Sequence, residues 1–252
     1  MLRRNLRRHF GKTNRKSTVS RHLRLEKCED RTVPSTYMPV YMMHSPGPGI
    51  TPQGSPTAAG SGGLLPVQIR GAYGFNNINF GNNAVGDGTG KTIAIVDAFD
   101  NPQFVNSSSP TFNTSDLHLF DTQLGIPDPP QFTKVNQTGG TSYPPAPSGP
   151  NFGWGGEIAL DVEWAHALAP NAKIILVEAT DASNNLFTAV NYAKTVANVV
   201  SLSWGSNESS GDTSFNSTLS QSGVTIVAAS GDNGKPGIFP AYSPNVVAVG
   251  DS

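Results

Sequence analysis

Apolar and polar residues follow two different spacings over residues 91–250, and the two spacings alternate along the chain. Continuous apolar runs predict buried strands over 91–99, 173–179, 199–204, 224–230 and 245–250. Apolar residues at helical spacing predict helices over 115–125, 155–168, 183–196 and, more weakly, 212–222. The segment 126–150 is rich in Pro, Gly and Thr and predicts mostly loop. Strands that alternate with helices predict an α/β fold in which helices cover both faces of a parallel sheet.

Residues 1–62 differ in composition from the rest of the chain. A basic segment is followed by MMHSPGPGITPQGSPTAAGSGG, which is too rich in Pro, Gly and Ser to pack a core. We therefore expect a basic leader and disordered linker over 1–62 and one folded domain over 63–252. The stretch LRLEKCEDRTVPS resembles a short leader of large exported bacterial proteins, so we expect an exported or extracellular protein. No apolar run of about 18 residues predicts a membrane span.

Charge separates the same two regions. Residues 1–32 contain 11 of the 17 Lys and Arg residues, which leaves 6 basic and 15 acidic residues in the remainder. An acidic body, and a basic segment without aromatic interleaving, argue against nucleic acid as a partner. Cys28 is the single cysteine, so no disulfide can form within the chain. The loop GDGTGKT fits a phosphate loop poorly, because Val85 stands where that motif needs Gly and a strand follows the loop, so we expect a flexible turn into that strand.

The stretch GWGGEIALDVEWAHALAP places two carboxyl groups on an apolar helix face. That face carries Trp154, Glu157, Ile158, Asp161, Trp164, Ala165 and Leu168. Glu157 and Asp161 are one turn apart, so their charges interact and one pKa should rise, which suits a proton shuttle in acid. The alternative is two solvated acids at a helix start, where the helix dipole favours them.

A second candidate lies in AASGDNG, where a buried strand delivers Asp232 into a turn. Ligands of parallel α/β sheets bind at the carboxyl ends of the strands. Gly231 and Gly234 allow the backbone to approach a substrate closely. The alternative is that Asp232 only forms the turn.

These motifs together resemble the sedolisins, the serine-carboxyl peptidases of the subtilisin-like superfamily. The resemblance runs in order through LLPVQIRGAYGF, GKTIAIVDAFDNP, DLHLFDTQLGIP, GGEIALDVEWAHALAPNAKIILVEA, VVSLSWG, AASGDNG and FPAYSPNVVAVG. It implies a subtilisin-like fold and endopeptidase activity in acid. It also implies that Glu157 is the general base, that Asp161 orients it, and that a protonated Asp232 helps to form the oxyanion hole. Trp204 and Asp97 match positions that extend this hydrogen-bond network.

The sequence departs from the family at its C-terminal side. The family's nucleophile follows a GTS-type motif downstream of the last matched stretch, and Ser203, Ser230, Ser243 and Ser252 do not match it. We therefore expect the N-terminal part of a catalytic domain, with no nucleophile in this chain. The family's calcium site lies in the same C-terminal part, so we expect no metal or cofactor here.

Several function classes remain after this comparison. The sequence predicts a serine-type endopeptidase acting on peptide or protein substrates, with a catalytically inactive peptide-binding protein as the alternative. A glycosidase is disfavoured, because its two carboxyls usually come from different segments. A His-based subtilisin is disfavoured as well, because neither His118 nor His166 lies in a strand-to-helix Gly context.

Overall fold

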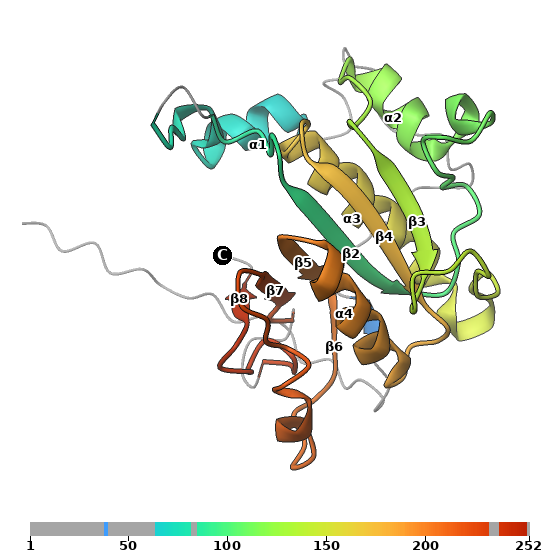
Figure 1. Ribbon diagram of the computed structural model, residues 1–252, viewed down its shortest axis with the longest axis vertical. Coiled ribbons are helices and arrows are strands. Elements are labelled where there is room, and N and C mark those ends of the chain that lie inside the picture. The colour runs from blue at the N-terminus through green and yellow to red at the C-terminus, as the bar shows by residue number, and fades with distance from the viewer. Residues whose placement is uncertain (1–37, 40–63, 82–84, 232–236, 251–252) are drawn as a thin grey trace, which may run out of the picture.

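A six-stranded parallel sheet forms the centre of the protein (Figure 1). The computed structural model describes residues 38–39, 64–81, 85–231 and 237–250. The sheet has the order β3-β4-β2-β5-β7-β8, and every neighbouring pair is parallel. Its strands are β2 (Thr92–Ala98), β3 (Phe132–Asn136), β4 (Lys173–Ala179), β5 (Val199–Leu202), β7 (Thr225–Ala229) and β8 (Val247–Val249). The predicted α/β architecture is confirmed.

Helices lie on both sides of this sheet (Figure 1). The helices are α1 (Pro66–Ala72), α2 (Asp116–Leu124), α3 (Gly153–Leu168) and α4 (Asn185–Val196). Short 3-10 turns are η1 (Phe75–Asn77), η2 (Phe112–Thr114), η3 (Gly149–Asn151) and η4 (Asp212–Phe215). A separate pair, β1 (Met38–Pro39) and β6 (Trp204–Gly205), is antiparallel. Within the described part of the chain, no helix is long and apolar enough to cross a membrane.

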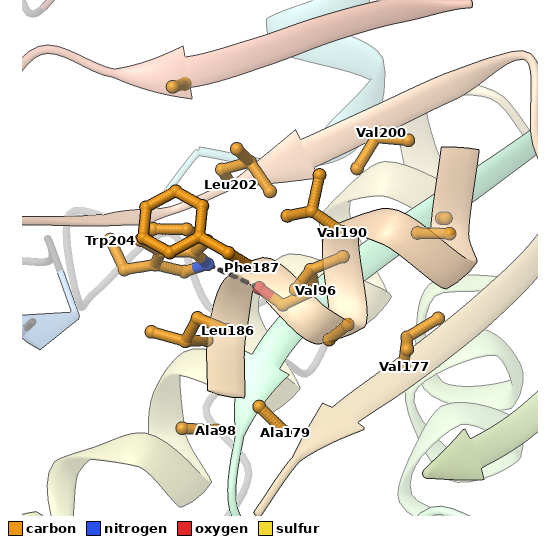
Figure 2. Close-up of a cluster of buried hydrophobic side chains, with 14 of the residues drawn as sticks. Val96, Ala98, Val177, Ala179, Leu186, Phe187, Val190, Val200, Leu202 and Trp204 are labelled. Atoms are coloured by element: carbon orange, nitrogen blue, oxygen red, sulfur yellow. Dashed lines mark hydrogen bonds between the residues drawn. The ribbon is translucent and has the colours of Figure 1, made fainter. Parts of the chain in front are cut away.

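The face of the sheet that meets α4 is apolar from Ala94 to Ala98 in β2 and from Ile175 to Ala179 in β4. Figure 2 shows Val96, Ala98, Val177 and Ala179 from the strands against side chains of α4. Phe187 of α4 stacks on Phe215 with ring centroids 4.0 Å apart and meets Trp204 edge-on at 5.4 Å. Because successive strand residues point to opposite faces, this layer takes every second residue of β2 and β4.

The opposite face packs against α3 and α2. Its buried core contains Ile95 and Leu176 from the strands and Ile158 and Val162 from α3. The next inward-facing residues along β2 and β4 are acidic, namely Asp97 and Glu178. The apolar layer therefore ends in buried carboxyl groups at the carboxyl ends of these strands.

The structure corrects three expectations about local structure. Residues 126–150 contain a strand, β3, whose buried Phe132 and Val135 were hidden among Pro, Gly and Thr. The helix predicted over 212–222 is only the short turn η4. The buried side of α3 uses Val162 and His166 rather than Trp164 and Leu168, because the sheet and α2 contact the helix from two directions.

Residues 86–91 form a turn that leads into β2, as the sequence predicted. The Asp87 carboxylate accepts a hydrogen bond from the Thr89 amide at 2.9 Å, which is the pattern of an Asx turn. Gly88 has φ +84°, and a Cβ there would lie 2.7 Å from the Ala172 Cβ. Glycine at this position therefore serves a tight turn against the end of α3.

Candidate active site

Polar side chains from neighbouring strands meet on the α3 face of the sheet. Asp97 of β2 and Glu178 of β4 are register partners, and each is 0% exposed. Ser203 follows β5 directly, on the other side of β2. Because all these strands are parallel, their carboxyl ends bring Ser203, Asp97 and Glu178 to one edge, where ligands of such sheets bind.

Helix α3 brings Glu157 and Asp161 to the same edge. The helix follows η3 and ends at Ala169 before Pro170, which cannot continue it. Glu157 lies near its N-terminal end and is 1% exposed, beside the buried Trp154 and Ile158. Asp161 is one turn further on and keeps partial exposure to solvent.

Asp161 is linked to both neighbouring strands of the site. Burial raises its pKa to about 6, and a hydrogen bond with the Ser203 side chain acts in the opposite direction. Burial also raises the pKa of Asp97 well above its usual range, and the charges of Asp161 and Glu178 add to that increase. Asp97 therefore lies between two other acidic groups, and both its burial and their charges favour its protonated form.

Trp204 supports this site from the opposite face of the sheet. Its indole Nε1 donates a hydrogen bond of 2.7 Å to the carbonyl of Val96 (Figure 2). Its ring belongs to the apolar layer beneath α4 and is 0% exposed. This hydrogen bond from the α4 side of the sheet fixes the backbone of Val96, the residue that precedes Asp97.

The structure brings together Asp161 and Asp97, two of the residues singled out from the sequence, and Glu157 lies one helical turn from Asp161 on α3. Asp232 lies outside the described residues. The chain leads toward it from β7 through Gly231, which has φ +89°, a conformation that favours glycine.

Several polar residues around this site were not anticipated from the sequence. Glu178 is buried beside Asp97, Lys134 and Asn101 are buried beside Glu178, and Ser203 contacts Asp161. The signal for Glu178 was its position as the last polar residue of a buried strand. Nothing in the sequence indicates Lys134 as a site residue, because the pattern predicts loop over the segment that contains β3. Among the described residues, no group of three or more His, Cys, Asp or Glu side chains could hold a metal ion.

A second group of buried acids lies between α3 and α2. The Nε2 atom of His166 lies 3.3 Å from an Asp121 oxygen and 2.9 Å from the carbonyl of Pro127. Burial raises the pKa of Glu163 to about 8, and the charges of Asp116 and Asp121 contribute. This group faces a helix and not the strand ends, so it serves as a structural contrast to the site.

Three similarities to known proteins bear on this site. Residues 149–252 match the subtilase family. Kumamolisin from Bacillus sp. (strain MN-32) is 34% identical over 185 residues, which covers 65% of this chain and 31% of kumamolisin. A structure of Pseudomonas sedolisin, a serine-carboxyl proteinase complexed with two molecules of pseudo-iodotyrostatin, has a similar fold with TM-score 0.50 and 22% identity, over 74% of this chain and 53% of that chain. The chain thus spans about a third of the length of the curated relative that it matches.

Proposed function

We propose that the chain is a member of the sedolisin/subtilisin-like family and is part of a serine-type endopeptidase that hydrolyses peptide bonds at acid pH. In this proposal Glu157 is the general base that takes the proton of a serine nucleophile. Asp161 orients Glu157, and a protonated Asp232 donates a hydrogen bond to the oxyanion. We assign none of the described serines as that nucleophile.

The environment of Asp161 is the observation that carries this proposal. Asp161 lies in hydrogen-bond contact with Ser203 and is electrostatically coupled to Asp97, so α3 and the strand ends form one site. Glu157 lies one helical turn away on the same helix side and is buried. The coupled carboxyls of Asp161 and Asp97 at the strand ends are suited to proton transfer.

The pKa values around the site favour work in acid. Asp161 has a pKa of about 6, raised mainly by burial, and Asp97 is raised further. Several buried carboxyls in contact are compatible with a stable fold only while most of them hold protons. The proposed oxyanion role of Asp232 likewise requires that its own carboxyl is protonated.

The strand β6 supports a peptide as the ligand. Met38–Pro39 pairs antiparallel with Trp204–Gly205, directly after Ser203. An extended segment thus adds to this strand, and a substrate peptide can pair in the same way. The same observation favours the alternative function, a catalytically inactive peptidase-like protein that binds peptides.

Peptide cleavage tests the proposal. The measurement uses protein expressed from the complete reading frame that contains this chain and a quenched fluorescent peptide at about pH 4, near the carboxyl pKa range. We expect turnover in the unaltered protein and a loss of about 10²- to 10⁴-fold in Glu157→Gln, since general base catalysis contributes that much.

Glu163→Gln is the matched control for this experiment. It makes the same change on the same helix, but Glu163 is surrounded by acids of α2, so we expect cleavage in acid to continue unchanged. Equal loss in both variants would count against a specific role of Glu157. Binding of the peptide without any cleavage would establish the peptide-binding alternative instead.

A further inference from the structure

Asn101 connects three parts of the protein that meet beside the candidate site. Its backbone N–H donates to Glu178 Oε1 at 3.0 Å, and its side-chain Nδ2 donates to the carbonyl of Gly155 at 3.0 Å. Its carbonyl accepts a hydrogen bond from Lys134 Nζ at 3.1 Å, and its Oδ1 accepts one from the Gln103 amide at 3.1 Å. Every hydrogen-bonding group of this buried residue is therefore engaged.

The bond to Gly155 reaches the part of α3 that matters for the site. Gly155 lies in the first turn of α3, two residues before Glu157. The helix start carries no side-chain cap, since Phe152 stands at the capping position. Asn101 is thus a side-chain contact that ties this first turn to the sheet.

Asn101 is itself held by buried charges. Lys134 Nζ lies 2.5 Å from Asp100 Oδ1 and 4.0 Å from Glu178 Oε1, and it also lies 4.4 Å from the centre of the Tyr143 ring. Burial raises the pKa of Glu178 to about 9, and the charge of Lys134 lowers it again in part. Asp97 of β2 faces Glu178 in register, and Asp161 of α3 is coupled to Asp97.

We propose that Asn101 is a positioning residue that ties the first turn of α3 to Glu178 and Lys134 and thereby fixes the place of the Glu157 carboxyl. The inference rests on the proposed function, in which Glu157 is the general base. Because each hydrogen-bonding group of Asn101 has a partner, this buried residue is held in one arrangement and can keep the first turn of α3 within the narrow limits that proton transfer needs. The role of Asn101 is to hold this geometry, and it does not contact the reacting atoms.

Two variants of Asn101 test the proposal. Asn101→Asp keeps the shape and the Oδ1 acceptor but loses the Nδ2 donor to Gly155, and Asn101→Ala loses both. We expect hydrogen exchange to become faster at the amides of the first turn of α3, and the ¹³C pH titration of the Glu157 carboxyl to shift. In peptide cleavage we expect kcat to fall about 10- to 100-fold with little change in KM, as for a misplaced catalytic group.

Asn198→Ala is the matched control. Asn198 accepts a hydrogen bond from the Thr92 amide at 3.0 Å, at the opposite end of β2, so its loss removes a similar bond far from α3. We expect this variant to leave the α3 amides, the Glu157 titration and kcat unchanged. Loss of stability alone, with faster exchange throughout the protein, would show that Asn101 is only structural and would overturn the proposal.

The two kinds of readout separate this inference from the proposed function. If the unaltered protein cleaves no peptide, the proposed function fails, while exchange and the Glu157 titration still report on the position of α3. If the protein cleaves peptides and both Asn101 variants match it in kcat, in α3 exchange and in the titration, Asn101 holds nothing in place and the inference is wrong.

Discussion

The two faces of the central sheet use the same strands for opposite purposes. Toward α4, β2 and β4 present Val96, Ala98, Val177 and Ala179, and the layer is apolar to its end. Toward α3, the residues between them end in Asp97 and Glu178. Neighbouring residues of one strand point to opposite faces, so one residue belongs to the stabilising core and the next to the candidate active site. The comparison indicates that the buried acids of this sheet gather at the strand ends on one face, where their raised pKa values favour the neutral form.

The largest expected effect comes from placing an acid on the wrong face. Val177 is completely buried in the apolar layer next to Glu178. We expect Val177→Asp to lower the free energy of unfolding by at least about 4 kcal/mol, because the new carboxyl has no partner there. Chemical denaturation followed by circular dichroism measures this loss. Glu178→Gln is the control and should leave stability in acid nearly unchanged, since Glu178 with a pKa of about 9 is already neutral there; similar losses in both variants would break the comparison.

The next largest loss of unfolding free energy is expected when a large side chain of the apolar face is truncated. Phe187 of α4 packs against Trp204 and Phe215 and is almost completely buried. We expect Phe187→Ala to cost about 3–5 kcal/mol of unfolding free energy, the usual cost of a large cavity. Leu160→Ala, on an exposed part of α3, should cost less than about 0.5 kcal/mol. A small loss for Phe187→Ala would mean that this face does not carry the core.

Trp204→Phe tests the hydrogen bond by which the apolar face supports the strand that carries Asp97. The variant keeps an aromatic ring in the apolar layer but removes the N–H that donates to the Val96 carbonyl. We expect a loss of about 1–2 kcal/mol in unfolding free energy, the cost of leaving a buried acceptor without its donor. Equilibrium denaturation checks this value. No measurable loss would show that the hydrogen bond does not brace the strand beside Asp97.

The smallest expected effect, taken per pH unit, concerns pH and the acids between α3 and α2. Burial raises the pKa of Glu163 to about 8 in the folded protein, while the unfolded chain has the ordinary value near 4.5. The folded state therefore holds a proton that the unfolded state has lost, and stability falls as pH rises from about 4.5 toward 8, by at most about 1.4 kcal/mol per pH unit.

Glu163→Gln tests this dependence directly. We expect little change in stability at about pH 4 and a more stable variant at about pH 8, because the amide has no proton to lose. Denaturant midpoints across this range measure the difference. A constant difference between variant and unaltered protein at all pH values would contradict the titration of Glu163.

The alternation of strands and helices was enough to predict the sheet, and the i, i+4 spacing of Glu157 and Asp161 was enough to put them on one side of α3. These are local properties with fixed periods, so a single sequence reveals them. Strand β3 was missed because its five residues lie among turn-forming residues. Asn101 and Lys134 were missed because their partners Gly155, Glu178 and Asp100 come from other elements of the fold.

The sequence alone determined the α/β class, the carboxyl pair on α3 and the acid after β7, and it supported the family through motifs in a fixed order. The tertiary structure decided which acids share one environment. Asp97 interacts with Asp161 and Glu178. Glu163, only two residues from Asp161, instead interacts with Asp116 and Asp121 of α2. The physical reason is that helical and strand periods fix the direction of a side chain, whereas its pKa and partners depend on which other elements pack against it.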